Sequence, residues 1–327
     1  MAQDSSPARP EPFAHMARNR QLLGSVLLIA GAWQMLTAFS RSFALPARAS
    51  LKGRVALVTG ANKGVGKEVA RKLADAGLHT VLGCRDLELG QAAVGELARD
   101  GGSVACTRLE LTDSASIQAA RDFILKEFGG LDILVNNAAV CFNDPTLYGK
   151  CEFTPFEKQA SITVDTNFFG TLAVTRALLP LLRQSESPRI VNVASYAGRL
   201  GILRSQQRVE DFTSDALRTE RLEELMREFV CDAEAGVHAS NGWPNTCYGV
   251  SKLGLIALTR ILAREEPKIM TNSVDPGYCA TDQNRHQGVW SAERGARTPC
   301  MLALLAESEF VTGQHFYDGA EMSWSYS

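Results

Sequence analysis

The chain has 327 residues, of which 45% are hydrophobic and 21% charged, and its formal net charge is −2. This balance is typical of a globular protein with one sizeable core or two small ones. The nearly neutral charge argues against a nucleic-acid-binding protein. The eight cysteines and five histidines are scattered, and they form no CxxC, HExxH or other ligand spacing. We therefore expect reduced thiols and no metal site.

The first 50 residues differ in composition from the rest. The stretch from Gln21 to Ser40 has no charged side chain, and Arg18 and Arg20 precede it. A basic flank before an apolar run is typical of a signal-peptide hydrophobic region or of one transmembrane helix. Residues 41–50 are rich in Arg, Ser and Ala and contain no acidic residue. Transit peptides have this composition, since they are rich in Arg and Ser and poor in acidic residues.

A signal-like segment followed by a transit-like segment resembles the bipartite leader of plastid proteins in algae with complex plastids. We therefore expect residues 1–50 to be a targeting leader and the protein to be located in a plastid. A membrane anchor in the secretory pathway, secretion and a cytoplasmic protein with a disordered tail remain open. Contact with a membrane is expected only through residues 21–40.

From residue 51 to residue 327, short apolar runs alternate with helical patterns. Strands are predicted at 54–59, 79–84, 103–111, 131–139, 189–195, 270–276 and 314–318. Helices are predicted at 65–77, 87–101, 114–130, 156–182, around 248–252 and through 303–306. Strict alternation predicts an α/β protein with a parallel sheet covered by helices on both faces. Right-handed crossovers make it a doubly wound parallel sheet, the Rossmann fold, in a single domain.

Residues 198–243 break this alternation just before the helix around 248–252. The segment is charged, and residues 218–230 show a helical pattern with Leu222, Leu225, Met226 and Phe229 on one face. We expect an insertion that packs a helix over the mouth of the sheet, with a peripheral surface helix as the alternative.

The sequence "TGANKGVG", Thr59 to Gly66, lies between a predicted strand and a predicted helix. In this context a glycine-rich loop predicts a dinucleotide site. Gly60 would allow a sharp turn, and Gly64 and Gly66 would let the backbone approach a pyrophosphate. The helix that starts near Val65 would direct its free N–H groups and its dipole at the phosphates.

The residue at the end of the second predicted strand indicates which dinucleotide the site prefers. An NAD site usually has an acidic residue there, which binds the ribose 2′-hydroxyl. Here Arg85 occupies that place, and Lys63 lies within the glycine loop. Two cations suit a 2′-phosphate, so NADP(H) is favoured over NAD(H). Asp86 is the competing signal, and we interpret it as the cap of the following helix.

Tyr248 and Lys252 are four positions apart, which places them on one face of a helix. An ammonium group near a phenol favours the phenolate and lowers the pKa of the phenol. A phenol tuned in this way is a general acid near neutral pH. A pair with this spacing is common on protein surfaces, and it is the glycine loop upstream that points to a reductase.

Six motifs occur in one order between Val55 and Asp282: "TGANKGVG", "NNAA", "TNFFGT", "IVNVAS", "YGVSK" and "DPGYCATD". This set resembles the short-chain dehydrogenase/reductase family, and the long insertion and "GWPNTCYGVSK" are most similar to its monomeric carbonyl reductase (NADPH) subgroup. The resemblance covers nearly all of the chain after residue 50. It implies an enzyme that reduces carbonyl groups with NADPH.

The resemblance also implies catalytic roles for four positions. Tyr248 would be the general acid, and Lys252 would hold the nicotinamide ribose and lower the Tyr248 pKa. Ser195 would bind the carbonyl oxygen of the substrate. Asn167 would hold a water that connects Lys252 to bulk solvent, unless its role is only to cap or kink its helix.

Cofactor contacts are implied in the same way. The glycine-loop residues Gly60, Asn62, Lys63, Gly64, Val65 and Gly66 would surround the pyrophosphate and the adenosine ribose. The other contacts would be Arg85 at the 2′-phosphate, Glu110 and Leu111 at adenine, Asn137 and Ala138 along the nicotinamide half, and Pro276, Gly277 and Thr281 at the nicotinamide end. Glu110 as a surface residue, Asn136 and Asn137 as a bridge between strands, and Tyr278 as either pocket wall or packing remain alternatives.

Two positions depart from the family pattern. Ala139 stands where a glycine is usual, and its methyl group could crowd the nicotinamide or need a small backbone shift. Glu110 replaces a shorter aspartate, which weakens the case for an adenine contact there.

The function predicted from these residues is NADPH-dependent reduction of aldehydes, ketones or quinones to alcohols. A short-chain dehydrogenase acting on a pigment, retinoid-like or steroid-like alcohol or ketone is one alternative. A non-catalytic NADP(H)-sensing module is the other. We also expect a monomer, because the insertion would cover the helix through which many family members pair.

Overall fold

The computed structural model describes residues 51–98, 103–142 and 153–324. The leader predicted at residues 1–50, with its apolar segment 21–40, lies outside the described residues. Within the described ranges, no helix is both long enough and apolar enough to cross a bilayer.

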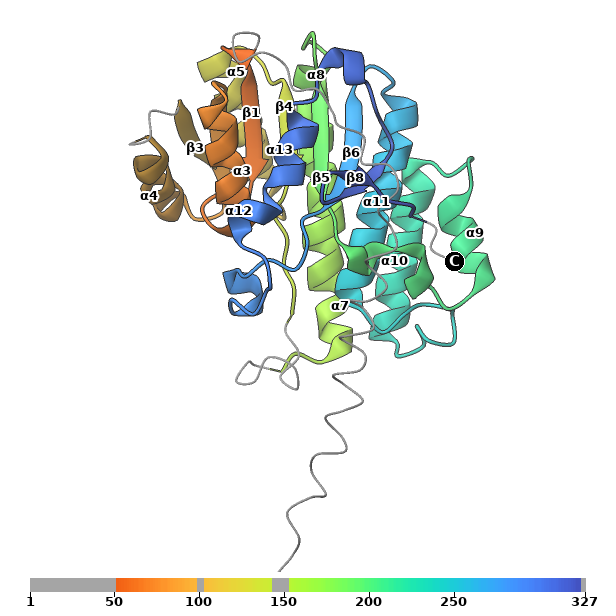
Figure 1. Ribbon diagram of the computed structural model, residues 1–327. Helices are drawn as coiled ribbons and strands as arrows, with labels where there is room; N and C mark the ends of the chain where they lie inside the picture. Colours follow the sequence, from red (N-terminus) through yellow and green to blue (C-terminus); the bar gives the residue numbers. More distant parts are fainter. Residues whose placement is uncertain (1–50, 99–102, 143–152, 325–327) are drawn as a thin grey trace, which may run out of the picture. The chain divides into compact units, whose positions relative to one another are not determined.

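The described strands form one sheet in the order β3-β2-β1-β4-β5-β6-β7-β8 (Figure 1). Their bounds are β1 Val55–Thr59, β2 His79–Cys84, β3 Val104–Arg108, β4 Ile133–Asn136, β5 Arg189–Val193, β6 Met270–Asp275, β7 His315–Tyr317 and β8 Ala320–Glu321. All neighbours pair in parallel except β7 and β8, which are antiparallel. The predicted doubly wound parallel sheet is confirmed, and the short strand β8 is an addition that the sequence did not indicate.

Both faces of the sheet are buried, because successive strand residues point to opposite sides. In β1, Ala56 and Val58 belong to one core cluster, whereas Val55 and Leu57 belong to another. This is why the strands appear in the sequence as continuous apolar runs rather than as alternating patterns.

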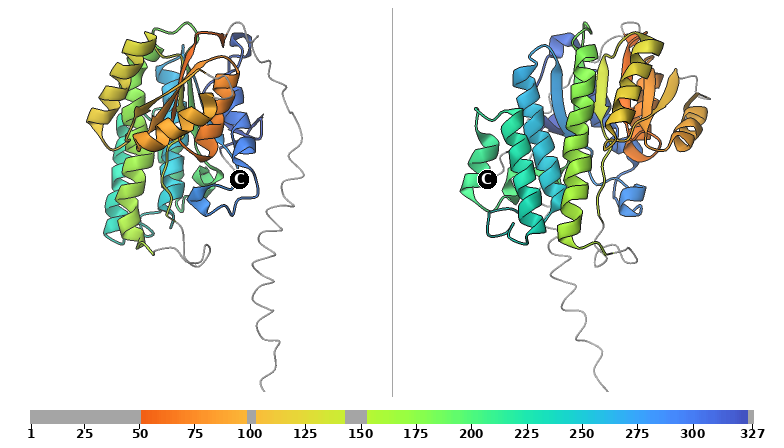
Figure 2. Two further views of the ribbon diagram at one scale, coloured as in Figure 1. Left: turned by 90° about the vertical axis from the view of Figure 1, so that its left-hand side faces the viewer. Right: turned by 180° about the vertical axis from the view of Figure 1, so that it is seen from behind.

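The helices that follow the strands cover these faces. Their bounds are α3 Gly64–Asp75, α4 Leu87–Ala98, α5 Ser114–Phe128, α7 Phe156–Val164, α8 Thr171–Leu182, α9 Gln206–Thr213, α10 Thr219–Glu234, α11 Cys247–Glu265, α12 Ala292–Gly295 and α13 Arg297–Ala303. Helices α3, α4 and α13 contribute to one core cluster, and α5 and α8 to the cluster on the opposite face. Figure 1 shows the first face with α3 and α13 in front, and the right-hand view of Figure 2, from the opposite side, shows α5, α8 and α11 in front of the sheet.

Two predicted helices have different bounds in the structure. The helix expected at 156–182 is interrupted by a π-helical segment, Asp165–Gly170, between α7 and α8. The helix expected through 303–306 ends at Ala303. π-helical segments are rare and occur frequently at functional sites, and this one contains Asn167.

The predicted insertion forms the helices α9 and α10. The face of α10 predicted from the sequence is fully buried, with Leu222, Leu225, Met226 and Phe229 at 0% exposure. These residues share a core cluster with α7 and α11. The expectation that the insertion packs over the mouth of the sheet is therefore wrong: α10 packs against α7 and α11, since its apolar face matches theirs.

Candidate active site

A cavity of about 690 Å³ lies at the carboxyl ends of the strands. Strand order reverses between β1 and β4, which run side by side although two strands separate them in sequence. In doubly wound sheets, ligands bind in the crevice at such a switch point. All of the site residues predicted from the sequence, except Asn167, line this cavity.

The glycine loop needs glycine at three positions for local reasons. Gly60 and Gly64 have φ values of +65° and +58°, which residues with a side chain rarely adopt. A Cβ on Gly66 would lie 2.4 Å from the Asn137 amide nitrogen and 2.5 Å from the Gly60 carbonyl oxygen. Gly66 therefore allows close packing between helix and strand, which differs from the pyrophosphate approach expected for it.

The N-terminus of α3 suits a phosphate group. No side chain caps it at Lys63, and its first turn contains no acidic residue. Free N–H groups and the positive end of the helix dipole therefore face the cavity, as anion binding requires. This turn, with the tight glycine loop before it, fits the pyrophosphate of a dinucleotide.

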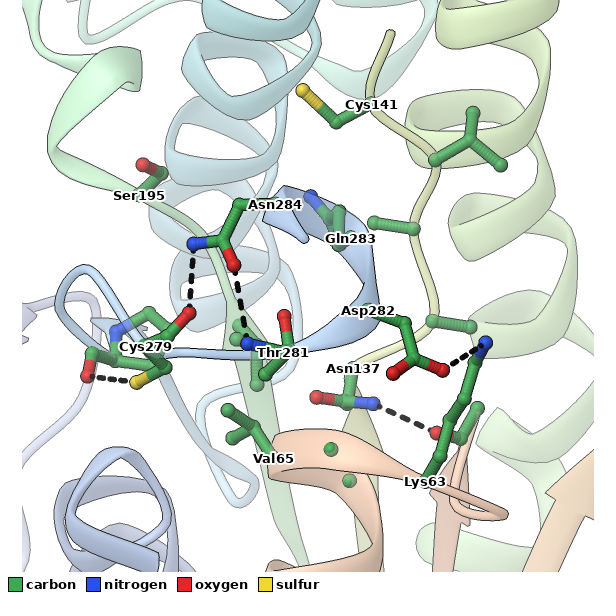
Figure 3. A pocket seen from close by; sticks show the side chains of 18 of the residues that line it. Lys63, Val65, Asn137, Cys141, Ser195, Cys279, Thr281, Asp282, Gln283 and Asn284 are labelled. Atoms are coloured by element: carbon green, nitrogen blue, oxygen red, sulfur yellow. Dashed lines mark hydrogen bonds and ion pairs between the residues drawn. The ribbon is translucent and has the colours of Figure 1, made fainter. Parts of the chain in front are cut away.

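Asn137 has a structural role in this loop. Its Nδ2 donates to the carbonyl oxygens of Thr59 at 2.9 Å and Gly60 at 3.2 Å (Figure 3). The Thr59 hydroxyl accepts from the backbone N–H groups of Asn137 and Ala138. These bonds fix the ends of β1 and β4 to each other, so the Asn137 amide shapes the cavity rather than offering itself to a ligand.

Asn136 bridges two strands, as the structural alternative in the sequence analysis proposed. Its Nδ2 donates to Asn192 Oδ1 at 2.9 Å and to Thr175 Oγ1 at 3.1 Å. Asn136 and Asn192 are register partners in β4 and β5. Asn136 is 3% exposed, which places it in the core.

The cations expected at the 2′-phosphate are both on the cavity wall and both solvent-exposed. Arg85 Nε lies 3.7 Å from Glu110 Oε2, and Lys63 Nζ lies 2.8 Å from Asp282 Oδ2 (Figure 3). Exposed ion pairs of this kind are weak, so both cations can turn to an anionic ligand at little cost. Asp86 accepts from the backbone N–H of Leu89 at 3.1 Å, and this confirms its interpretation as the cap of α4.

The Tyr248 hydroxyl and the Lys252 ammonium group have different neighbours. The side chains of Gln283 and Ser195 lie close enough to the Tyr248 hydroxyl to lower its pKa, against the larger effect of burial. Lys252 Nζ donates to the carbonyl oxygen of Val193 at 2.8 Å and lies 5.5 Å from the centre of the Tyr248 ring. Helix α11 positions both residues, because Thr246 caps its first turn by accepting from Gly249 N–H at 2.9 Å.

The pKa of Tyr248 differs in direction from the sequence-based expectation. Burial raises it well above the usual 10.0, and the negative charge of Asp275 acts in the same direction. Burial also lowers the pKa of Lys252 to about 8. In the protein alone, desolvation therefore outweighs the attraction between ammonium and phenolate. The phenol stays protonated at neutral pH, as a proton donor must.

Asn167 lies behind the cavity wall, with only 1% of its surface exposed. Its Oδ1 accepts from Val140 N–H at 2.8 Å, and its Nδ2 donates to Val140 O at 2.9 Å and to Ser251 Oγ at 3.0 Å. The side chain thus ties the segment after β4 to the helix that carries Tyr248 and Lys252.

The segment after β6 covers the glycine loop. Gly277 has φ +80°, and a Cβ there would lie 2.4 Å from the Trp290 ring, so this position is glycine for packing reasons. Thr281 faces Gly64 and forms a capping box with Asn284. Trp290 anchors the far end of the segment, since its ring stacks on Tyr317 with 5.3 Å between centroids.

Several cavity residues were missed by sequence reasoning, among them Cys141, Asp275 and Gln283. In the view of Figure 3, Gln283 lies below Cys141, and it lowers the pKa of both Cys141 and Tyr248, against the larger effect of burial. Only Asp275 had a sequence signal, because it is an acidic residue at the end of an apolar strand.

The remaining expectations concern Ala139, Tyr278, the cysteines and metals. Ala139 lines the cavity and is absent from the described non-glycine residues with positive φ, so its methyl group causes no backbone strain. Tyr278 lines the cavity and is 46% exposed, which favours its role as a wall. The seven cysteines within the described ranges are free thiols, and no His, Cys, Asp or Glu cluster in those ranges could hold a metal.

Residues 54–206 match the family model described as short chain dehydrogenase. The chain is 42% identical over 284 residues to carbonyl reductase [NADPH] 1 of Mus musculus, and the match covers 83% of this chain and 98% of that protein. The chain belongs to the short-chain dehydrogenase family. The human carbonyl reductase [NADPH] 1 is 41% identical over 281 residues, with the same coverage.

Solved structures agree with this membership. Salutaridine reductase from Papaver somniferum superposes with a TM-score of 0.73 at 35% identity, covering 81% of this chain and 99% of that one. Menthone neomenthol reductase from Mentha piperita superposes with a TM-score of 0.69 at 33% identity, covering 81% and 98%. As a family member, the protein is an oxidoreductase built on the predicted fold.

Proposed function

We propose that this protein reduces aldehydes, ketones or quinones to alcohols with NADPH, and that Tyr248 donates the proton. The protein is an NADPH-dependent oxidoreductase of the carbonyl reductase type, and its substrates are small carbonyl compounds. The names of its relatives support this. The uncapped helix N-terminus and the two exposed cations on the cavity wall support it independently.

The observation that carries the proposal is the placement of the Tyr248 and Ser195 side chains together at the cavity wall, where Ser195 acts on the Tyr248 pKa. Two hydroxyl groups that meet at one point can both donate to the oxygen of a carbonyl group that enters there. Donors fixed in advance at a developing oxyanion stabilise the transition state without reorganisation. When bound, the reduced nicotinamide supplies the hydride for the carbonyl carbon.

The remaining residues prepare this donor pair. Tyr248 remains protonated because burial raises its pKa, so it can give its proton to the alkoxide oxygen. Lys252 is charged below about pH 8 and lies on the same helix face, where its positive charge favours the phenolate left after proton transfer. We propose that Asn167 helps to reprotonate the site through a water bound nearby.

The test is NADPH consumption by the full-length protein with a panel of carbonyl compounds. The panel should contain simple aldehydes, aryl ketones, quinones and large hydrophobic alcohols and ketones. Product alcohol should appear in equal amount to the NADPH consumed. A protein that binds NADPH and turns over no member of the panel would instead be the non-catalytic module.

We also propose that the protein is a monomer. Helix α10 packs against α11, the helix that carries Tyr248, and together with α7 they form one buried cluster. The right-hand view of Figure 2 shows α10 beside α11. A partner could not pair through that covered face of α11, and a dimer mass in light scattering would contradict this.

The targeting leader and the plastid location remain proposals that depend on the composition of residues 1–50. They predict that the protein recovered from its native cell starts beyond the apolar segment 21–40. N-terminal sequencing of that material separates a cleaved leader from a retained anchor.

A further inference from the structure

Asp275 is a buried carboxyl group in the candidate active site that the mechanism above does not use. It is the last residue of β6, it lines the cavity, and it is 6% exposed. A buried carboxylate is costly unless it is paired or hydrogen-bonded. Its contacts therefore indicate why it is there.

The carboxylate joins the turns that follow β5 and β6. Its Oδ1 accepts from the backbone N–H of Gly277 at 2.9 Å. The backbone of Tyr196, the residue directly after Ser195, lowers the pKa of the same carboxyl group. The carboxylate therefore lies beside the turn that carries Ser195 while it is hydrogen-bonded to the turn that begins the segment bearing Thr281.

The same carboxylate is close to the catalytic ammonium group through the sheet register. Lys252 Nζ donates to the carbonyl oxygen of Val193, and Val193 is the register partner of Val274 in β6. Asp275 follows Val274 and ends β6. Its carboxylate therefore lies next to the end of β5, to which the Lys252 ammonium group is hydrogen-bonded. Lys252 is 2% exposed, so little solvent screens its charge from that of Asp275.

The pKa values of Lys252 and Asp275 agree with this placement. Burial lowers the pKa of Lys252, and the negative charge of Asp275 opposes that effect. Burial raises the pKa of Asp275, and the N–H groups of Gly277 and Tyr196 together with the Lys252 charge oppose it. Each partner therefore favours the charged form of the other.

We propose, on the basis of the function proposed above, that Asp275 is a positioning residue for carbonyl reduction. Its carboxylate holds the Ser195 turn in place and keeps Lys252 charged beside Tyr248. This role differs from that of Tyr248, because Asp275 acts through Lys252 and the turn rather than on the substrate.

Other titratable groups face this carboxylate and have to be included in the test. They are Tyr248 and Lys252 on α11, Cys279 on the segment after β6, and Tyr317, its register partner on β7. Cys141, on the segment after β4, acts on the same Tyr248 and Lys252. None of these groups changes in the Asp275 variants, so a shift that follows the removal of Asp275 belongs to its charge.

The variant is Asp275→Asn, which keeps the size of the side chain and removes its charge. The matched control is Asp232→Asn in the insertion, where the carboxylate accepts from Trp243 Nε1 at 3.0 Å away from the cavity. The first measurement is an NMR titration of the lysine side chains in the protein without cofactor, with the Lys252 signal assigned by its loss in Lys252→Met. The second is the pH dependence of kcat for NADPH-dependent reduction.

We expect the Lys252 midpoint to fall by about one pH unit in Asp275→Asn, the shift typical of losing a nearby opposite charge. The basic limb of the kcat profile should move to lower pH by the same amount. Asp232→Asn should leave both unchanged. Asp275→Ser, which also lacks the charge but keeps an acceptor oxygen, should reproduce the shift if Asp275→Asn folds poorly.

A Lys252 midpoint that stays at the wild-type value in both Asp275 variants would overturn the inference. So would a shifted midpoint with an unshifted kcat profile, because Asp275 would then have no effect on the reduction. If the wild-type protein reduces no carbonyl compound, the proposed function fails instead. The NMR titration would in that case still decide whether Asp275 acts on Lys252.

Discussion

The ammonium nitrogen of Lys252 lies 5.5 Å from the centre of the Tyr248 ring while it donates to the Val193 carbonyl oxygen. The lysine is therefore anchored to the sheet and presents its charge beside the phenol without bonding to it. Such a charge favours the phenolate formed by proton transfer and leaves the hydroxyl free for Ser195 and the substrate.

Tyr248→Phe should remove the proton donor and keep the helix. We expect the rate of carbonyl reduction to fall by about a hundredfold to ten-thousandfold, the usual contribution of a general acid. The affinity for NADPH, measured by fluorescence titration, should change by less than about threefold. Near-normal turnover in a variant that still binds NADPH would show that another group supplies the proton.

The reduction should lose activity as the pH rises through the Lys252 pKa of about 8. The charged form is present below that pH and lost above it, so kcat should be flat near neutrality and fall on the alkaline side. Because the folded-state pKa lies below the ordinary 10.5, the folded protein releases this proton first. The contribution of Lys252 to the free energy of unfolding therefore rises with pH between these two values.

Kinetic profiles of the wild type and of Lys252→Met test this. The variant should be slow at every pH and should lack the alkaline fall assigned to Lys252. An alkaline fall at the wild-type position in the variant would assign that limb to a different group.

Arg85→Ala should weaken NADPH selectively. A hydrogen bond to a charged group is worth about 1.5–3 kcal/mol, and exposure of Arg85 places the expected loss of affinity near the lower end, at about tenfold. NADH affinity should change by less than about twofold. Arg108→Ala is the matched control, since Arg108 is an exposed arginine paired with Asp113 at 2.9 Å. Equal losses for both cofactors would remove Arg85 from the 2′-phosphate site.

Acid should destabilise the protein through His315. This residue is 5% exposed, its Nδ1 lies 2.9 Å from Ser273 Oγ, and burial lowers its pKa from 6.5 to about 4. Between these values the unfolded chain binds a proton that the folded protein does not. Stability is therefore lost as the pH falls through this window, by on the order of 3 kcal/mol.

Urea denaturation across that window measures the effect. His315→Asn should flatten the pH dependence relative to the wild type, whereas substitution of the exposed His286 by Asn should not. A wild-type slope in His315→Asn would mean that other groups cause the acid sensitivity.

Phe229→Ala should destabilise the insertion and spare the chemistry. Phe229 is 0% exposed and contacts Trp243 edge-on, with 5.4 Å between ring centroids. Its truncation should cost about 3–5 kcal/mol of unfolding free energy. Since the described lining of the cavity includes no residue of 199–243, kcat of the folded variant should stay within about twofold of the wild type. Phe153→Ala, at a position 73% exposed, should change stability by less than about 0.5 kcal/mol.

The sequence by itself determined the features that depend on neighbours along the chain. The glycine loop, the order of strands and helices, the buried face of α10 and the shared helix face of Tyr248 and Lys252 all follow from periods of two or 3.6 residues and from short motifs. Membership in the short-chain dehydrogenase family, and with it the fold, is confirmed.

Only the tertiary structure decided what depends on contacts between distant segments. In the fold, Asp275 lies beside the Ser195 turn and Gln283 lies beside Tyr248. Asn137 is hydrogen-bonded to the glycine loop, and the insertion packs against α7 and α11 rather than over the mouth of the sheet. The tertiary structure also reversed the expected direction of the Tyr248 pKa. A local pattern states which charges are near in sequence, whereas desolvation depends on how many atoms from other segments surround the group in the fold.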